Sequence, residues 1–211
     1  MLNLFIAASV LSALLAIAVE WREQRHPVFY VLKPLTTLLI IGIAAQAPAG
    51  ELRVLMLVAL GLSLLGDICL MFSGNGWFMG GLSSFLLAHV AFIPALLHGV
   101  QNPSLPWWSI AIVLYGVVFF AWLLPKTGSL KIAVVIYGTV LMAMLLAAIA
   151  RWQLLPGTAS AWALTGALLF VISDSSLSVR QFSGRYRGAQ ALILSTYWSA
   201  IGCIAYASTL M

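Results

Sequence analysis

The sequence predicts an all-α polytopic membrane protein, with a single domain of eight transmembrane helices spanning residues 1–211. Two observations predict this class: 63% of the 211 residues are hydrophobic, and only 7% are charged. A water-facing surface normally carries about a quarter charged residues, so the composition excludes a soluble domain. The net charge of +5 then indicates basic membrane loops and not nucleic-acid binding.

Each helix is predicted from one apolar stretch of suitable length, because a spanning helix needs about 20 apolar residues. Charged or turn-forming residues, such as Gly74-Asn75-Gly76, separate the stretches. No connection is long enough to hold a soluble domain. The predicted segments are Leu2–Val19, Val28–Gln46, Leu52–Phe72, Phe78–Val100, Pro106–Leu124, Leu130–Ala150, Ser160–Arg180 and Gly188–Leu210.

Two local features bear on processing and redox chemistry. Met1-Leu2-Asn3 lacks the basic flank of a signal peptide, so we expect the first segment to remain as a transmembrane helix. Cys69 and Cys203 lie in different segments and at different expected depths, which predicts two reduced structural thiols.

The basic residues predict the orientation. Most of them follow odd-numbered segments, and Lys and Arg concentrate in cytoplasmic loops. We therefore expect the odd loops in the cytoplasm and both termini outside, in a bacterial inner membrane. The first side holds Arg22, Arg25, Lys126, Lys131, Arg180, Arg185 and Arg187; the other holds Arg53 and Arg151.

Two of the five acidic residues, Asp67 and Asp174, fall inside predicted helices. Such a carboxylate costs ~2.5–3.5 kcal/mol on insertion scales, which favours a functional role over a structural cap or pair. In a site shielded from water, one carboxyl can keep a proton as general acid while the other stays ionised as base. Ser63 and Ser178 each lie four residues from one Asp and share its helix face.

Depth predicts which other polar residues join the pair. At 1.5 Å per residue, the Asp residues and Lys33 lie about 8–9 Å from the cytoplasmic helix ends. By the same rise, Tyr137 and Tyr197 lie about 10–14 Å deep, and His89 about 17 Å. Helices that run in both directions thus place polar groups in one layer, so we expect the active site in the cytoplasmic half of the membrane.

Each of these polar neighbours could have either a structural or a functional role. Lys33 either reaches the headgroups along its own stem, or serves as a counter-ion or phosphate ligand. His89 either is structural or donates to a substrate oxygen or an Asp, and Tyr137 and Tyr197 could be core residues. Because His26, His89 and His98 are scattered, we expect no metal site and no cofactor.

A short internal similarity predicts a parallel repeat of four helices and four helices. Gly66-Asp67-x-x-Leu70 and Ser173-Asp174-x-x-Leu177 each end the third helix of one half. An interval of four helices makes the halves parallel and not inverted.

Four motifs stand out in order along the chain. They are Lys33-Pro34-Leu35-Thr36-Thr37-Leu38-Leu39, Ser63-Leu64-Leu65-Gly66-Asp67-x-x-Leu70-Met71, Phe85-Leu86-Leu87-Ala88-His89-Val90-Ala91-Phe92-Ile93 and Gly166-Ala167-Leu168-Leu169-Phe170-Val171-Ile172-Ser173-Asp174-Ser175-Ser176-Leu177. Together they resemble the motifs of the YhhN/lysoplasmalogenase family of integral membrane proteins. One departure concerns the last helix, where the family's Tyr-Tyr-x-Ala-Gln type motif is replaced by Thr196-Tyr197-Trp198-Ser199-Ala200-Ile201, without the Gln.

The resemblance implies hydrolysis of the vinyl-ether bond of lysoplasmalogens, giving a fatty aldehyde and a glycerophospho-headgroup. Protonation of the β-carbon gives an oxocarbenium ion that water attacks, for which two carboxylates suffice. We expect Asp67 and Asp174 to be catalytic, without deciding which is the acid. The expected substrate-binding residues are Lys33, His89, Tyr197, Ser63, Ser173 and Tyr137.

The expected partner is a single-chain ether phospholipid that enters from the inner leaflet, with its headgroup near Lys33 and the basic loops. The number of subunits is left open. Two other functions remain as alternatives. A proton-coupled transporter could use the Asp pair as a relay. A metal-dependent hydrolase of the ceramidase sort would need a metal site, which the scattered histidines disfavour.

Overall fold

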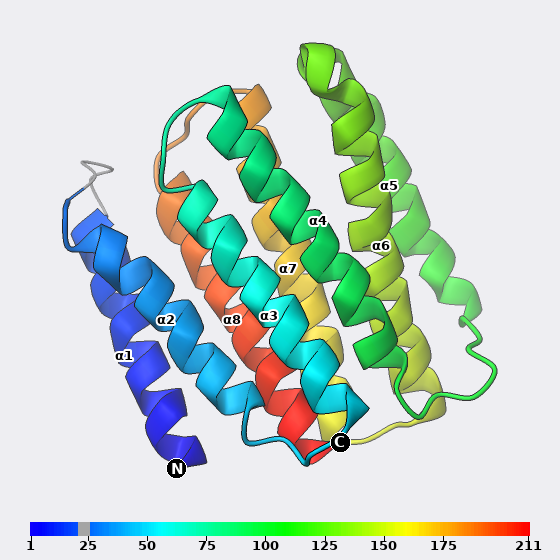
Figure 1. The fold of residues 1–211 in the computed structure, drawn as a ribbon. Coiled ribbons are helices and arrows are strands. Elements are labelled where there is room, and N and C mark those ends of the chain that lie inside the picture. The colour runs from blue at the N-terminus through cyan, green and yellow to red at the C-terminus, as the bar shows by residue number, and fades with distance from the viewer. Residues whose placement is uncertain (21–25) are drawn as a thin grey trace.

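The computed structural model describes residues 1–20 and 26–211, and over these it is helical without strands. Figure 1 shows the helices side by side, most of them joined by short turns. Short 3₁₀ turns at 107–109, 124–126 and 128–130 flank α5. The helices are α1 Leu2–Glu20, α2 Phe29–Ala44, α3 Glu51–Cys69, α4 Asn75–Leu97, α5 Ile110–Leu123, α6 Lys131–Leu154, α7 Thr158–Phe182 and α8 Ala189–Leu210.

The predicted eight-helix membrane bundle is confirmed over the described residues, with some ends displaced. Seven of the spans, some including the adjoining 3₁₀ turns, are long and apolar enough to cross a membrane, whereas α2 has 16 residues. The predicted third segment ran to Phe72, but α3 ends at Cys69. The next helix already begins at Asn75, because Gly74 adopts a φ of +119° and turns the chain sharply.

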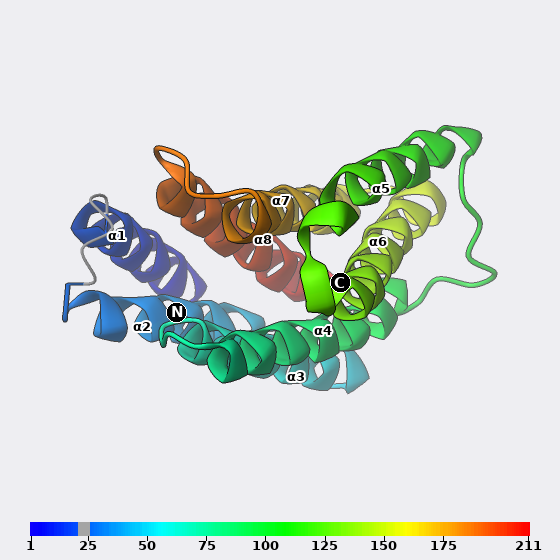
Figure 2. The same cartoon turned by 90° about the horizontal axis from the view of Figure 1, so that it is seen from above.

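Six helices form a closed ring. Around it, α2 packs on α3, α3 on α4, α4 on α6, α6 on α7, α7 on α8 and α8 on α2 (Figure 2). Helix α1 lies outside the ring against α2 and α8, and α5 lies outside it against α6 and α7. Both outer spans are only 17% buried, so lipid covers most of their surface.

The order of helices around the ring is the same in the first and second halves of the chain, as in a two-fold arrangement. Helices α2, α3 and α4 are followed by α6, α7 and α8, and each half has its first helix outside. A parallel duplication would produce this order. The repeat itself stays a prediction, now with a defined correspondence of α3 to α7, α2 to α6 and α4 to α8.

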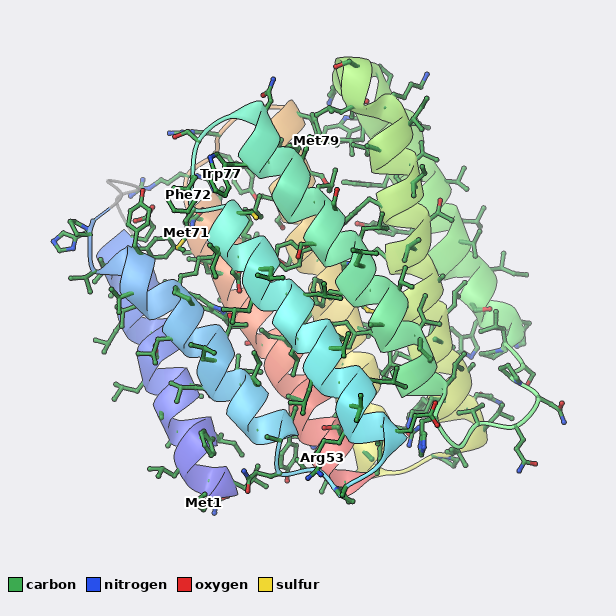
Figure 3. The ribbon with its side chains drawn as sticks, viewed as in Figure 1. Met1, Arg53, Met71, Phe72, Trp77 and Met79 are labelled. Atoms are coloured by element: carbon green, nitrogen blue, oxygen red, sulfur yellow. The ribbon has the colours of Figure 1, made fainter. Side chains whose placement is uncertain are left out.

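The turns after α3, α5 and α7 lie together at one end of the bundle, called here the mouth end (Figure 1). Both chain ends lie at the opposite end. Figure 3 places Phe72 and Trp77 at the mouth end and Arg53 at the other. The orientation of the mouth end toward the cytoplasm stays a prediction. Two of the basic residues on which it rests, Arg22 and Arg25, lie outside the described residues.

Small residues let the ring helices approach closely. A Cβ on Gly166 of α7 would lie 2.7 Å from the carbonyl oxygen of Ala200 on α8. A Cβ on Gly66 of α3 would lie 2.6 Å from the ring of Phe85 on α4. Helix association in lipid depends on such close van der Waals packing. Gly66 directly precedes Asp67, and Phe85 and Asp67 line the same cavity.

Candidate active site

The Asp67 carboxylate is held by donors from two other ring helices. Lys33 on α2 places Nζ 3.3 Å from Asp67 Oδ1 and donates to the Asp67 backbone carbonyl at 3.0 Å. Thr37, one turn further along α2, donates to Oδ2 at 2.6 Å. Tyr197 on α8 donates to the same oxygen at 2.8 Å. Asp67 is 1% exposed, so these protein donors, and not bulk water, surround its carboxyl group.

The Asp174 carboxylate has fewer partners. Tyr137 on α6 donates a short hydrogen bond to Oδ2. Nε2 of His89 on α4 lies 3.9 Å from the same oxygen, beyond hydrogen-bond distance. Asp174 itself is 7% exposed, and no lysine or arginine of residues 1–20 and 26–211 pairs with it. The two carboxylates therefore differ in charge environment.

Each ring helix thus supplies part of the site, and the two carboxylates have corresponding surroundings. Asp67 on α3 receives a hydroxyl from α2 and an aromatic hydroxyl from α8. Asp174 on α7 receives a hydroxyl from α6 and faces an aromatic nitrogen from α4. Under the two-fold order these helices correspond in pairs. Lys33 breaks the correspondence, because the residue one turn before Tyr137 is Ala133.

Both carboxylates line one cavity of about 350 Å³ inside the ring. Phe85 and Tyr197 form part of its wall and meet edge to face, with ring centroids 5.6 Å apart. Behind this wall, Phe170 packs against Tyr197 at 5.7 Å and against His89 at 4.5 Å. These rings are buried and pack against one another, so they hold the wall of the cavity in place beside the two carboxylates.

Basic and amide side chains line the cavity where it opens at the mouth end. Arg180 on α7 donates to the side chain of Gln190 on α8, and Arg185 comes from the turn between these helices. The beginning of α4 also borders the opening through Gly74 and Asn75. The first backbone N–H groups of a helix lack intrahelical acceptors and favour anions. The opening is therefore suited to a phosphate group.

Apolar cavities adjoin Asp174 on the far side from α8. One, of about 30 Å³, lies against Leu82, Phe85 and Tyr137. The next, of about 40 Å³, lies between α5, α6 and α7 beside Gly116. Asp174 thus lies between the 350 Å³ cavity, called here the polar chamber, and these two apolar cavities.

The structure places the predicted site residues in three groups. Lys33, Asp67, Asp174, Ser173 and Tyr197 line the cavity, and Tyr137 lines the apolar cavities beside it. His89 is fully buried behind Asp174 and borders neither.

Ser63 does not reach the cavity. It shares the helix face of Asp67 as predicted, but its hydroxyl donates to the Ala59 carbonyl within α3. This bond between a serine and the preceding turn satisfies the hydroxyl locally. Ser173 also donates to a backbone carbonyl, that of Ile193, although it borders the cavity.

The histidines are spread as the sequence indicates. His89 is fully buried within α4, whereas His26 precedes α2, His98 follows α4, and both are exposed. Over the described ranges, no three His, Cys, Asp or Glu side chains gather in a way that could hold a metal ion. The absence of a cofactor stays a prediction.

Several residues of the site were not singled out from the sequence. Thr37 lies four residues after Lys33, so the helical period could have placed it on the same face. Phe85 stands four residues before His89 in the same way. The sequence places the headgroup near the basic loops without naming Arg180 or Arg185, since nothing in a sequence distinguishes a loop arginine that lines a cavity from one that faces water.

The ring of spanning helices and the enclosed carboxylate pair define an integral membrane protein with a polar chamber open at one end. The chain belongs to the YhhN family, whose model matches residues 28–208. This confirms the resemblance carried by the four motifs.

Curated relatives have names that state an activity. The chain is 32% identical over 148 residues to "Lysoplasmalogenase TMEM86A" from Bos taurus, covering 68% of this chain and 60% of that one. It is 33% identical over 166 residues to "Lysoplasmalogenase" from Mycobacterium bovis and from Mycobacterium tuberculosis, covering 76% of this chain and 61% of each of those. The chain thus aligns with about three fifths of the length of these relatives. No solved structure matches it.

Proposed function

We propose that the protein hydrolyses the vinyl-ether bond of lysoplasmalogens, releasing a fatty aldehyde and a glycerophospho-headgroup. The observation that carries this proposal is the position of two buried carboxylates on one chamber that is basic at its opening and apolar beside Asp174. A single-chain phospholipid has the same order of groups: an anionic phosphate, a short polar glycerol and a hydrocarbon chain. The names of the relatives support the same substrate.

The proposed reaction begins with proton transfer from a carboxylic acid to the β-carbon of the vinyl ether. The resulting oxocarbenium ion is attacked at the α-carbon by water, whose proton passes to the second carboxylate. The hemiacetal then loses its hydroxyl proton, its bond to the glycerol oxygen breaks, and that oxygen takes up a proton. Cavity water returns the proton from the second carboxyl to the first, so each group is restored.

The unequal partners of the two carboxylates assign the roles. Asp67 has an ion pair with Lys33 and two hydroxyl donors, an arrangement that keeps it a carboxylate. Asp174 has one phenol donor, no cationic partner among the described residues and an apolar cavity on one side, so we assign the proton to it. In this assignment Asp174 protonates the β-carbon and Asp67 activates the water.

The headgroup occupies the opening in this scheme. Arg180, Arg185 and the first turn of α4 are the proposed phosphate site because they border the opening of the cavity, whereas Lys33 is buried beside Asp67. Arginine suits this role because its planar donors match phosphate oxygens. With the mouth end toward the cytoplasm, the lipid enters from the inner leaflet.

Turnover by purified protein tests the proposal. Aldehyde release is measured with a lysoplasmalogen, with its saturated alkyl-ether analogue and with an acyl lysophospholipid. We expect cleavage of the vinyl ether only, because neither analogue forms an oxocarbenium ion upon protonation of a C=C bond. Asp67→Asn and Asp174→Asn should each lower kcat by about 10²–10⁴-fold, the usual contribution of general acid–base catalysis.

Glu51→Gln serves as the matched control, because Glu51 is exposed in the first turn of the same helix as Asp67. Monodispersity and thermal unfolding show whether each variant is folded. Undiminished turnover in both Asn variants would contradict the proposal. Movement of lipid across proteoliposomes without turnover would instead support the proton-coupled transporter.

A further inference from the structure

The crevice beside Asp174 runs toward the lipid-facing side of the molecule. Its inner part is bordered by Leu82 and Phe182, and its outer part by Gly116, Phe120 and Met142. Tyr137, Asp174 and Ser178 border both parts, so the two cavities adjoin one another along α6 and α7. We call these two cavities together the lateral crevice.

Helix α5 forms the outer wall of the lateral crevice and is weakly held. Only Gly116 and Leu123 of this helix are buried. One hydrogen bond of 2.8 Å, between the hydroxyls of Tyr115 and Ser175, ties α5 to α7. Tyr115 also borders the crevice and is 44% exposed, so this bond lies at the membrane end of the crevice.

The geometry points to the lateral crevice as the binding site for the hydrocarbon chain of the lipid, with the Tyr115–Ser175 bond closing its membrane end. This inference rests on the proposed function, because the occupant is the chain attached to the reacting bond. Three observations favour a hydrocarbon chain over other occupants. The lining is almost wholly apolar, the inner end reaches Asp174, and the outer end faces the bilayer.

The crevice is small, so a hydrocarbon chain can enter it only if α5 moves outward. Its two parts, of about 30 and 40 Å³, hold only a few methylene groups as they stand. A longer chain must continue along the outer faces of α5 and α6 into the bilayer. The aldehyde can then leave sideways into lipid, while the water-soluble headgroup leaves through the mouth end.

Gly116 offers a direct way to fill the crevice. A Cβ at this position would lie 3.5 Å from Met142 Cγ, an ordinary contact with a flexible side chain. At Gly138, by contrast, a Cβ would lie 2.1 Å from the Phe120 ring, so substitution there disturbs packing. A larger side chain can therefore be introduced at Gly116, which borders the crevice, with less strain than at Gly138. Val117→Leu is the matched control, since Val117 is the next residue and is 59% exposed.

The first experiment compares vinyl-ether substrates with a long and with a four-carbon chain. We expect Gly116→Leu to raise KM for the long substrate about tenfold, the loss of burial of two methylene groups. The four-carbon substrate should be cleaved by Gly116→Leu as by the wild type, and Val117→Leu should match the wild type on both. An unchanged dependence on chain length in Gly116→Leu would overturn the inference. Absence of cleavage by the wild type would instead contradict the proposed function.

The second experiment needs no turnover and no variant. A non-hydrolysable alkyl-ether lysophospholipid with a diazirine on its chain is photolysed with the wild-type protein, and labelled peptides are mapped. We expect labels on the α5 and α6 peptides that contain Gly116 and Met142, and competition by unlabelled lysolipid. Labels elsewhere, or equal labelling by a two-chain phospholipid probe, would overturn the inference, because bulk lipid would then explain the contact.

Tyr115→Phe tests the closing bond. It removes one hydroxyl and keeps the ring, so the rate of labelling should rise about fivefold, the effect of one lost hydrogen bond. An unchanged rate would show that the Tyr115–Ser175 bond does not close the crevice.

Discussion

Lys33 Nζ lies 3.3 Å from Asp67 Oδ1, deep in the ring, and no comparable cation accompanies Asp174 within the described part of the chain. The lysine is 6% exposed and is turned into the bundle, not toward the headgroups. This contact is the main difference between the surroundings of Asp67 and Asp174, because their other partners come from helices that are equivalent under the two-fold order. It is also the basis for assigning one as base and the other as acid.

Replacing Lys33 by alanine should remove activity and stability together. The Asp67 carboxylate would remain buried without its cation, which typically costs about 3–5 kcal/mol. The double variant Lys33→Ala/Asp67→Asn should regain much of the thermal stability but no turnover, because the buried charge is gone and the base with it. Lys131→Ala, on an exposed residue, is the control. If Lys33→Ala alone were as stable and as active as the wild type, the result would contradict a role for the ion pair.

Replacing Tyr137 by phenylalanine should affect catalysis more than folding. Among the described residues, the Tyr137 phenol is the one hydroxyl that donates to Asp174, so its loss leaves the acid free to turn away from the substrate. We expect kcat to fall about 10–100-fold, with a loss of stability of about 1 kcal/mol. Steady-state kinetics and thermal unfolding measure the two effects. Tyr206→Phe is the control, since Tyr206 packs on Trp162 away from the site; equal effects of both variants would argue against a specific role.

Replacing Arg185 by alanine should weaken substrate binding. A phosphate at the cavity opening would lose one cation, so KM should rise about tenfold with kcat little changed, as for an interaction made equally in ground and transition states. The effect should be largest for the phosphate-bearing substrate and absent for an uncharged vinyl ether. Arg187→Ala is the control, because Arg187 lies on the same turn but does not border the cavity. A fall in kcat with unchanged KM would place the phosphate elsewhere.

Arg151 should prove structural. It is buried at the end of the bundle opposite the site and donates to the carbonyls of Leu96 at 3.3 Å and His98 at 2.7 Å. These acceptors end α4, where a cation is favourable. Arg151→Met should lower the free energy of unfolding by about 1–3 kcal/mol, the cost of buried acceptors left without donors. The kcat/KM of the folded fraction should stay that of the wild type; a selective change in KM would refute a purely structural role.

Hydropathy and the helix rise were enough to predict the eight helices and to place the polar residues in one layer. They measure depth along each helix, and depth alone brought Asp67, Asp174 and Lys33 together. Neighbours around the ring depend on tertiary packing, so the sequence did not reveal which hydroxyl faces which carboxylate. Ser63 shows the limit clearly, because it lies on the expected face and yet bonds its own backbone.

The two-fold order of the ring has a consequence for biogenesis. Lys33 and Thr37 meet Asp67 within the first four helices, and Tyr137 meets Asp174 within the last four. Each carboxyl group therefore has at least one hydrogen-bond donor within its own half of the chain. Two contacts cross between the halves: Tyr197 on α8 reaches Asp67, and His89 on α4 approaches Asp174. Both need the two halves to meet, α8 against α2 and α4 against α6. Under the proposed function, a chain whose halves have not yet packed together cannot hydrolyse the lipids around it. The complete active site forms only in the last step of assembly.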